Sequence, residues 1–180
     1  MTISERVDER LYTAVIPPEM LRRGFWLYVW IVTLRDGRTV YHVGRTGDSS
    51  SPHAQSVFGR ISGHLGKKEN NNALQRNLKR HGIEFSQCLK LEVVAHGPLH
   101  DEVGNLGAHY PLRDRTHALE RDLCNAMRAA NYGVLNNVSC RTPTSVSEWT
   151  AVRATFAKHF ERLAPSSPAP AINRRASMPR

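Results

Sequence analysis

The sequence has no closely spaced pair of cysteines, and this absence excludes the common cysteine-based architectures. Its three cysteines, Cys88, Cys124 and Cys140, are odd in number and far apart, with no C-x-x-C motif among them. A disulfide framework and a zinc ribbon both need paired or clustered cysteines. We therefore expect three reduced, buried thiols and a cytoplasmic protein.

Long hydrophobic runs are missing as well. The longest, residues 24–34, is too short to cross a bilayer as a helix. The first ten residues carry three acidic side chains and no apolar stretch, which is unlike a signal peptide. The sequence thus predicts a soluble protein with no membrane partner.

Acidic residues are scarce relative to basic ones. The chain has 25 lysines and arginines against 16 aspartates and glutamates, a formal net charge of +9. Such an excess favours a polyanionic partner, either a nucleic acid or an anionic membrane surface. Many small basic proteins bind neither, so charge alone does not identify the partner.

The length of 180 residues suits one domain with appendages better than two domains. Residues 1–22 are expected to form a leader, which Pro17-Pro18 interrupts. Residues 23–163 are expected to form the folded domain. Residues 164–180 are rich in proline and serine and poor in apolar side chains, which predicts a disordered basic tail.

Hydrophobic patterning inside the domain predicts three strands and four helices. We expect strands at 25–34, 38–44 and 88–95. We expect helices at 56–67 and 71–81, then, after a polar segment at 96–115, from about 116 to 132 and from 145 to 163. The order β-β-α-α-β-α-α predicts an α+β domain in which helices flank a small three-stranded antiparallel sheet.

Residues suited to phosphodiester chemistry are spread over these elements. Arg60 and His64 are four residues apart on a predicted helix, so a cation and an imidazole share one face. Tyr28 and His42 lie upstream on strands, and Glu120 lies downstream on a helix. Arginine suits phosphate, and a carboxylate suits Mg²⁺. The set predicts a site that cuts phosphodiesters.

In these motifs the chain resembles the GIY-YIG nuclease family over about residues 25–138. The matching segments are Trp26-Leu27-Tyr28, His42-Val43-Gly44, Arg60 with His64, residues 74–85, Ala118-Leu119-Glu120, and residues 132–136, which end on Asn136. Trp26 replaces the first glycine of the first motif, and His42 replaces the tyrosine of the second. The long interval between Gly44 and Arg60 suggests an inserted loop at 47–56 that could contact substrate.

The resemblance implies a metal-dependent endonuclease that hydrolyses DNA by a single-metal mechanism. It implies Tyr28 as general base or water-positioning group, Arg60 on the scissile phosphate, and Glu120 on Mg²⁺ or Mn²⁺. His42 could share or assume the role of base, since an unperturbed imidazole pKa of about 6.5 suits it. His64 could donate to phosphate or orient a tyrosine, and Asn136 could fix substrate or a water.

The turn between the first two strands decides which side chain accompanies Tyr28, because neighbours on a strand point to opposite faces. A two-residue turn at Asp36-Gly37 would place Tyr41 on the face of Tyr28. A three-residue turn at 35–37, with Gly37 left-handed, would place His42 there. Alignment on the glycine of the second motif favours His42.

Basic residues outside the catalytic set are expected to contact the DNA backbone. They are Arg45, Lys67, Lys68, Arg76, Lys79 and Arg80. An ordinary solvated surface is the alternative for this set. Two other functions also stay open: an inactive nucleic-acid-binding module of the same fold, and an interaction protein whose basic surface serves protein partners. The sequence leaves the oligomeric state open.

Overall fold

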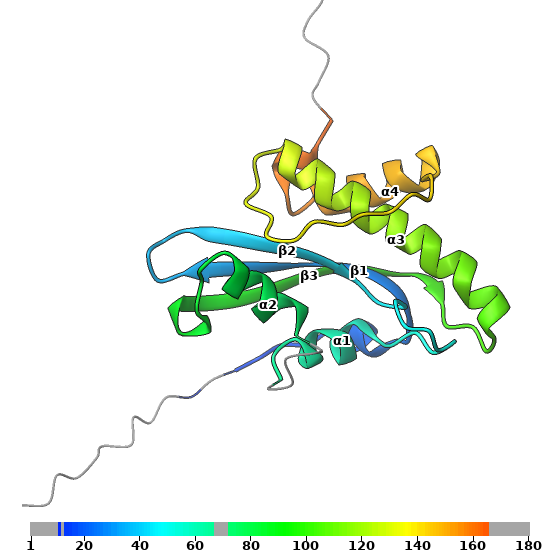
Figure 1. The fold of residues 1–180 in the computed structure, drawn as a ribbon, viewed down its shortest axis with the longest axis horizontal. Helices are drawn as coiled ribbons and strands as arrows, with labels where there is room; N and C mark the ends of the chain where they lie inside the picture. Colours follow the sequence, from blue (N-terminus) through cyan, green and yellow to red (C-terminus); the bar gives the residue numbers. More distant parts are fainter. Residues whose placement is uncertain (1–10, 12, 67–71, 166–180) are drawn as a thin grey trace, which may run out of the picture.

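Three strands form one antiparallel sheet with β1 in the middle (Figure 1). The computed structural model describes residues 11, 13–66 and 72–165. The strands are β1 (Gly24–Leu34), β2 (Thr39–Arg45) and β3 (Cys88–Asp101), in the order β2-β1-β3. The predicted α+β class and the order of its strands and helices are confirmed.

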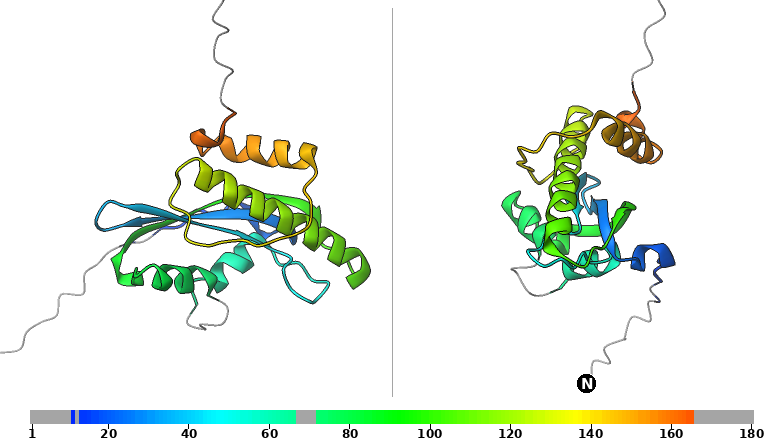
Figure 2. Two further views of the ribbon diagram at one scale, coloured as in Figure 1. Left: turned by 45° about the horizontal axis from the view of Figure 1, so that its top comes forward. Right: turned by 90° about the vertical axis from the view of Figure 1, so that its right-hand side faces the viewer.

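Helices cover the sheet in two layers (Figures 1 and 2). On one face lie α1 (Val57–Gly63) and α2 (Ala73–Arg80), and on the other lie α3 (Leu106–Ala129) and α4 (Val146–Ala157). Short 3₁₀ helices occur at η1 (Pro18–Leu21), η3 (Phe85–Gln87) and η4 (Glu161–Leu163). The sheet is therefore the middle of three layers.

The central strand β1 supplies both hydrophobic cores. Leu27, Val29 and Ile31 pack against the buried side of α3 and α4, which includes Leu123 and Phe156. The alternate residues of β1 are Trp26, Tyr28, Trp30, Val32 and Leu34, and they pack with α1 and α2. Because successive side chains point to opposite faces, one unbroken apolar strand fills two cores.

The turn between β1 and β2 has three residues, 35–37, with Gly37 at φ +87°. In the resulting register Trp30 pairs with His42. Tyr28, two residues before Trp30, therefore shares a face with His42. The three-residue alternative is confirmed, and Tyr41 points to the opposite core.

Several predicted boundaries are wrong. The segment 96–115 is not a polar connection, because β3 continues to Asp101 beside the long β1 and α3 begins at Leu106. Asn105 caps α3 by accepting the Ala108 N–H at 2.8 Å, although Pro111 lies inside the helix. Pairing and capping across the segment thus outweigh its polar composition.

Other expectations need smaller corrections. Helix α1 ends at Gly63 rather than at 67, which leaves Leu65 exposed. Helix α4 ends at Ala157, and the predicted stripe continues through η4 instead, which buries Leu163. Of the three cysteines only Cys124 is buried.

Some expectations concern residues outside the described ranges. Lys67 and Lys68 lie outside them, as do residues 1–10 of the leader and 166–180 of the tail. The described part of the leader includes η1. Among the helices of the described ranges, none is both long and apolar enough to cross a membrane.

Candidate active site

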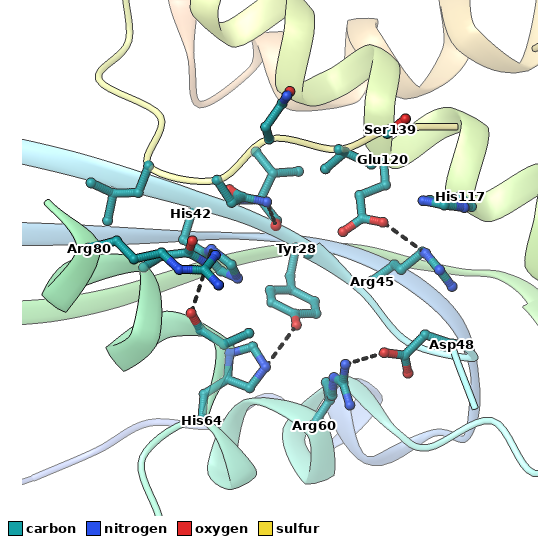
Figure 3. Close-up of a pocket in the computed structure, with 18 of the residues that line it drawn as sticks. Tyr28, His42, Arg45, Asp48, Arg60, His64, Arg80, His117, Glu120 and Ser139 are labelled. Atoms are coloured by element: carbon teal, nitrogen blue, oxygen red, sulfur yellow. Dashed lines mark hydrogen bonds and ion pairs between the residues drawn. The ribbon is translucent and has the colours of Figure 1, made fainter. Parts of the chain in front are cut away.

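A cavity of about 470 Å³ lies along β2, at an edge of the sheet (Figure 3). Side chains reach it from α1 and α2 in one layer, from α3 in the other, and from the segment that follows Leu135. All six predicted catalytic or metal-binding residues line it: Tyr28, His42, Arg60, His64, Glu120 and Asn136. Of the predicted DNA contacts, Arg45 and Arg80 line it too.

Gly44 explains how Tyr28 reaches this edge from the central strand. The two residues are paired across β1 and β2. A Cβ atom at position 44 would lie 2.5 Å from Cζ and Oη of Tyr28. The phenol ring therefore lies across the space that a side chain at position 44 would occupy, and its hydroxyl reaches the cavity.

We expect Gly44→Ala to displace the Tyr28 ring and to lower the free energy of unfolding by about 1–3 kcal/mol, the usual cost of overpacking. Urea denaturation would measure this loss. Gly63→Ala is the matched control, because a Cβ there meets nothing within 4 Å. Equal stability of Gly44→Ala and wild type would contradict the proposed packing.

Tyr28 is linked to His64, the C-cap residue that follows α1. Tyr28 Oη lies 3.4 Å from His64 Nε2, and the indole of Trp30 donates to His64 Nδ1 at 3.2 Å. Burial raises the pKa of Tyr28 above its usual value, although Arg60 opposes the shift. Tyr28 thus keeps its proton at neutral pH, which suits the water-positioning role better than the role of base.

His42 is buried on the same face and is paired with Asn77. Asn77 Nδ2 donates to the carbonyl of Ala73 and lies 3.4 Å from His42 Nδ1. Burial, together with the neighbouring His64, lowers the pKa of His42 to about 3. The expectation of a histidine base rested on the unperturbed value of about 6.5, and that value does not hold here.

Two arginines meet two carboxylates in the cavity. Arg60 is paired with Asp48 from the loop after β2, and Arg45 Nε bonds Glu120 Oε2 at 2.8 Å (Figure 3). Arg45 Nη1 and Arg60 Nε are buried and have no hydrogen-bond partner among the residues that the structure describes. Buried donors of this kind are costly unless an acceptor completes them, and the oxygens of an anion would do so.

Burial and a neighbouring positive charge shift the pKa of Glu120 in opposite directions. Its side chain is 13 % exposed, and burial raises its pKa to about 7, although Arg45 opposes the shift. His117, one helical turn earlier on α3, also lines the cavity. Glu120 therefore changes its charge near neutral pH, and a second cation beside it would favour the carboxylate.

Asn136 lines the cavity, and its side-chain amide forms hydrogen bonds with the main chain. Its Oδ1 accepts the Val43 N–H at 3.0 Å, and its Nδ2 donates to the Val43 carbonyl at 2.8 Å. Just before it, Leu135 N–H donates to the Tyr41 carbonyl. The amide thus continues the pairing along the edge of β2. The predicted contact of Asn136 with substrate or water stays a prediction, which would use the second acceptor site of Oδ1 or the second N–H of Nδ2.

The remaining predicted DNA contacts in the described ranges lie on α2. Arg76, Lys79 and Arg80 are exposed, while Leu74 and Leu78 of the same helix are buried. Arg80 lies at the cavity, whereas the other two do not line it. Arg45, predicted as a phosphate contact, forms an ion pair with Glu120 through its Nε.

Sequence reasoning missed four residues of the site: Trp30, Asp48, Asn77 and His117. Two of them had a signal. Trp30 is two residues after Tyr28 on one strand face, and His117 is three before Glu120 on one helix face. Asp48 is an acid in a loop of serines and glycines, where nothing in the spacing points to Arg60.

The donor set fits a hard divalent ion only in part. The described part of the chain has no group of three or more metal-binding side chains. Glu120 points from α3 into the cavity, with one oxygen toward Arg45 and the other turned away from it (Figure 3). Mg²⁺ is commonly bound by one or two carboxylates together with waters and substrate phosphates. Glu120 can provide one such carboxylate.

No protein-family model matches this chain, and comparisons with curated proteins and with solved structures give no match either.

Proposed function

We propose that this protein is a metal-dependent endonuclease that hydrolyses phosphodiester bonds in DNA. The observation that carries the proposal is the meeting of Arg60, Arg45 and Glu120 around the Tyr28–His64 pair in one cavity. Each of the two arginines has a buried donor that finds no partner within the described part of the chain, which is expected of a phosphate-binding site. The net charge of +9 favours a polyanionic substrate.

Each side chain has its own role in the proposed reaction. Arg60 and Arg45 hold the phosphate and stabilise the charge that develops on it. The Tyr28 hydroxyl orients the attacking water, and His64 orients Tyr28. Glu120 would hold a Mg²⁺ or Mn²⁺ ion, which when bound would neutralise charge on the phosphate and lower the pKa of water. His42, neutral and buried, supports the ring of His64, whose centroid lies 5.8 Å away.

Supercoiled plasmid incubated with the protein and Mg²⁺ tests the proposal. We expect nicking by the wild type and about 100-fold slower nicking by Glu120→Gln, because an amide is a weaker ligand and carries no charge. Glu92→Gln is the matched control, because Glu92 is a half-buried carboxylate on β3 that does not line the cavity. No cleavage by the wild type, or equal cleavage by wild type and Glu120→Gln, would refute the proposal.

An inactive DNA-binding module is the second candidate. It is favoured by the ion pair that Glu120 already makes with Arg45 at 2.8 Å. Such a module would bind DNA with an affinity that falls steeply with salt and would not cut it. Binding measured at two salt concentrations, beside the plasmid assay, separates the two candidates.

A further inference from the structure

Tyr28 lies on β1 between two tryptophans whose indole N–H groups have different partners. Trp26 Nε1 donates to the main-chain carbonyl of Arg22 at 3.1 Å. Trp30 Nε1 donates to Nδ1 of His64 at 3.2 Å. Both tryptophans are 3 % exposed and belong to the same core. Of the two indole N–H groups, the one on Trp30 donates to a side chain of the candidate active site, and the one on Trp26 donates to the main chain.

The contact with Trp30 determines where the His64 ring carries its proton. An indole N–H can only donate, so the ring nitrogen that faces it must be an unprotonated acceptor. The single proton of the neutral imidazole then lies on Nε2, which is 3.4 Å from Tyr28 Oη. Burial lowers the pKa of His64 to about 4, and nearby Arg60 acts in the same direction. The ring is therefore neutral at physiological pH.

We propose that Trp30 is a positioning residue, which holds His64 in the Nε2–H tautomer and so makes Tyr28 Oη the acceptor of the His64–Tyr28 hydrogen bond. The hydroxyl proton of Tyr28 is then turned away from His64 and toward the cavity. There it can donate to a water or to a phosphate oxygen. The effect on cleavage rests on the proposed function, whereas the direction of the hydrogen bonds does not.

Without the indole, His64 is free to adopt the other tautomer. Its Nε2 would then accept the hydroxyl proton of Tyr28, and Tyr28 would have no proton to offer to the cavity. This reversal needs no movement of any heavy atom. It therefore predicts a change in function without a change in fold, which a purely structural role for Trp30 would not produce.

Nuclear magnetic resonance of protein labelled with ¹⁵N in histidine and tryptophan tests the assignment directly. In the wild type at neutral pH we expect His64 to have an unprotonated Nδ1 and a protonated Nε2. We also expect a scalar coupling across the hydrogen bond from Trp30 Nε1 to His64 Nδ1. A proton on Nδ1 would overturn the proposal, whatever the protein does to DNA.

The variant Trp30→Phe keeps an aromatic ring and removes the donor. We expect it to show both tautomers of His64, and to lower kcat for DNA cleavage about tenfold with KM unchanged, the typical effect of one lost hydrogen bond. Trp26→Phe is the matched control, since it removes an indole from the same core, and we expect it to leave the His64 tautomer and kcat unchanged.

The outcomes are distinct. A single Nε2–H tautomer in Trp30→Phe, or equal effects of the two variants on tautomer and kcat, would overturn the role of Trp30. If the wild type does not cleave DNA, the proposed function fails and the tautomers still decide the role of Trp30. If Trp30→Phe does not fold, the wild-type coupling to His64 decides it.

Discussion

Replacing Arg60 with alanine is expected to slow phosphodiester cleavage about 1,000-fold, equivalent to about 4 kcal/mol of transition-state stabilisation. Arg60 lies in the cavity beside Tyr28, and its Nε is a buried donor that no described residue pairs with. An oxygen of a phosphate bound there would accept a hydrogen bond from this donor. The negative charge that develops on the phosphate during attack would strengthen that hydrogen bond. Single-turnover cleavage of a labelled duplex with excess protein measures the loss.

The contact between Arg60 and Asp48 supplies the control for a structural effect. If Arg60 acted only by holding the loop after β2, then Asp48→Asn would break the same ion pair and slow cleavage equally. If Arg60 binds phosphate, Asp48→Asn removes a competing anion and cleavage stays at the wild-type rate or rises. Equal losses in Arg60→Ala and Asp48→Asn would contradict phosphate binding.

Arg60→Lys refines the test. Lysine keeps the charge but lacks the planar fork that binds two phosphate oxygens at once. We expect a rate between those of the wild type and the alanine variant. Full activity of the lysine variant would mean that charge alone is sufficient at this position.

The strands and helices were predictable wherever one periodicity dominated. The apolar run of β1 indicates a strand, and the four-residue spacing of Leu119 and Leu123 indicates a helix. The structure of segment 96–115 was not predictable in this way, because its pairing with β1 depends on residues some 70 positions away. Neither pairing between distant strands nor a cap at Asn105 produces a hydrophobic periodicity in the sequence of so short a segment.

The members of the candidate site were easier to predict than their roles. Order along the chain indicated that Tyr28, Arg60 and Glu120 belong together, and the cavity includes all three. Burial then decides what each can do, and burial depends on the whole fold. The low pKa of His42 and the bonds of Asn136 to Val43 both follow from packing that spacing does not encode.

Acidification from pH 7 to pH 5 is expected to lower the free energy of unfolding through His42 and His64. Their pKa values are lowered by burial to about 3 and about 4, whereas both return to about 6.5 in the unfolded chain. Below pH 6.5 the unfolded chain therefore binds protons that the folded protein does not. Each histidine removes about 2 kcal/mol of stability by pH 5, or about 4 kcal/mol together.

Glu120 acts in the opposite direction over the same range. Its folded pKa is raised to about 7, above the usual value for a glutamate, so the folded protein binds a proton that the unfolded chain releases. Protonation of Glu120 therefore adds about 2 kcal/mol to the free energy of unfolding by pH 5. The wild type should therefore lose about 2 kcal/mol, the difference between the two effects. His96, His100 and His117, whose pKa values are also lowered, add to the loss.

Variants separate these opposing effects, and urea denaturation at pH 7, 6 and 5 measures them. Glu120→Gln should steepen the loss to about 4 kcal/mol, because only the histidine effect remains. The double variant His42→Gln with His64→Gln should lose about 4 kcal/mol less stability than the wild type over this range, because the effect of the two buried imidazoles is removed. His159→Gln, on the exposed surface after α4, is the control and should follow the wild type. A double variant that loses as much stability as the wild type would show that these two imidazoles are not held neutral by burial, and the reasoning that assigns His64 a single ring proton would lose its support.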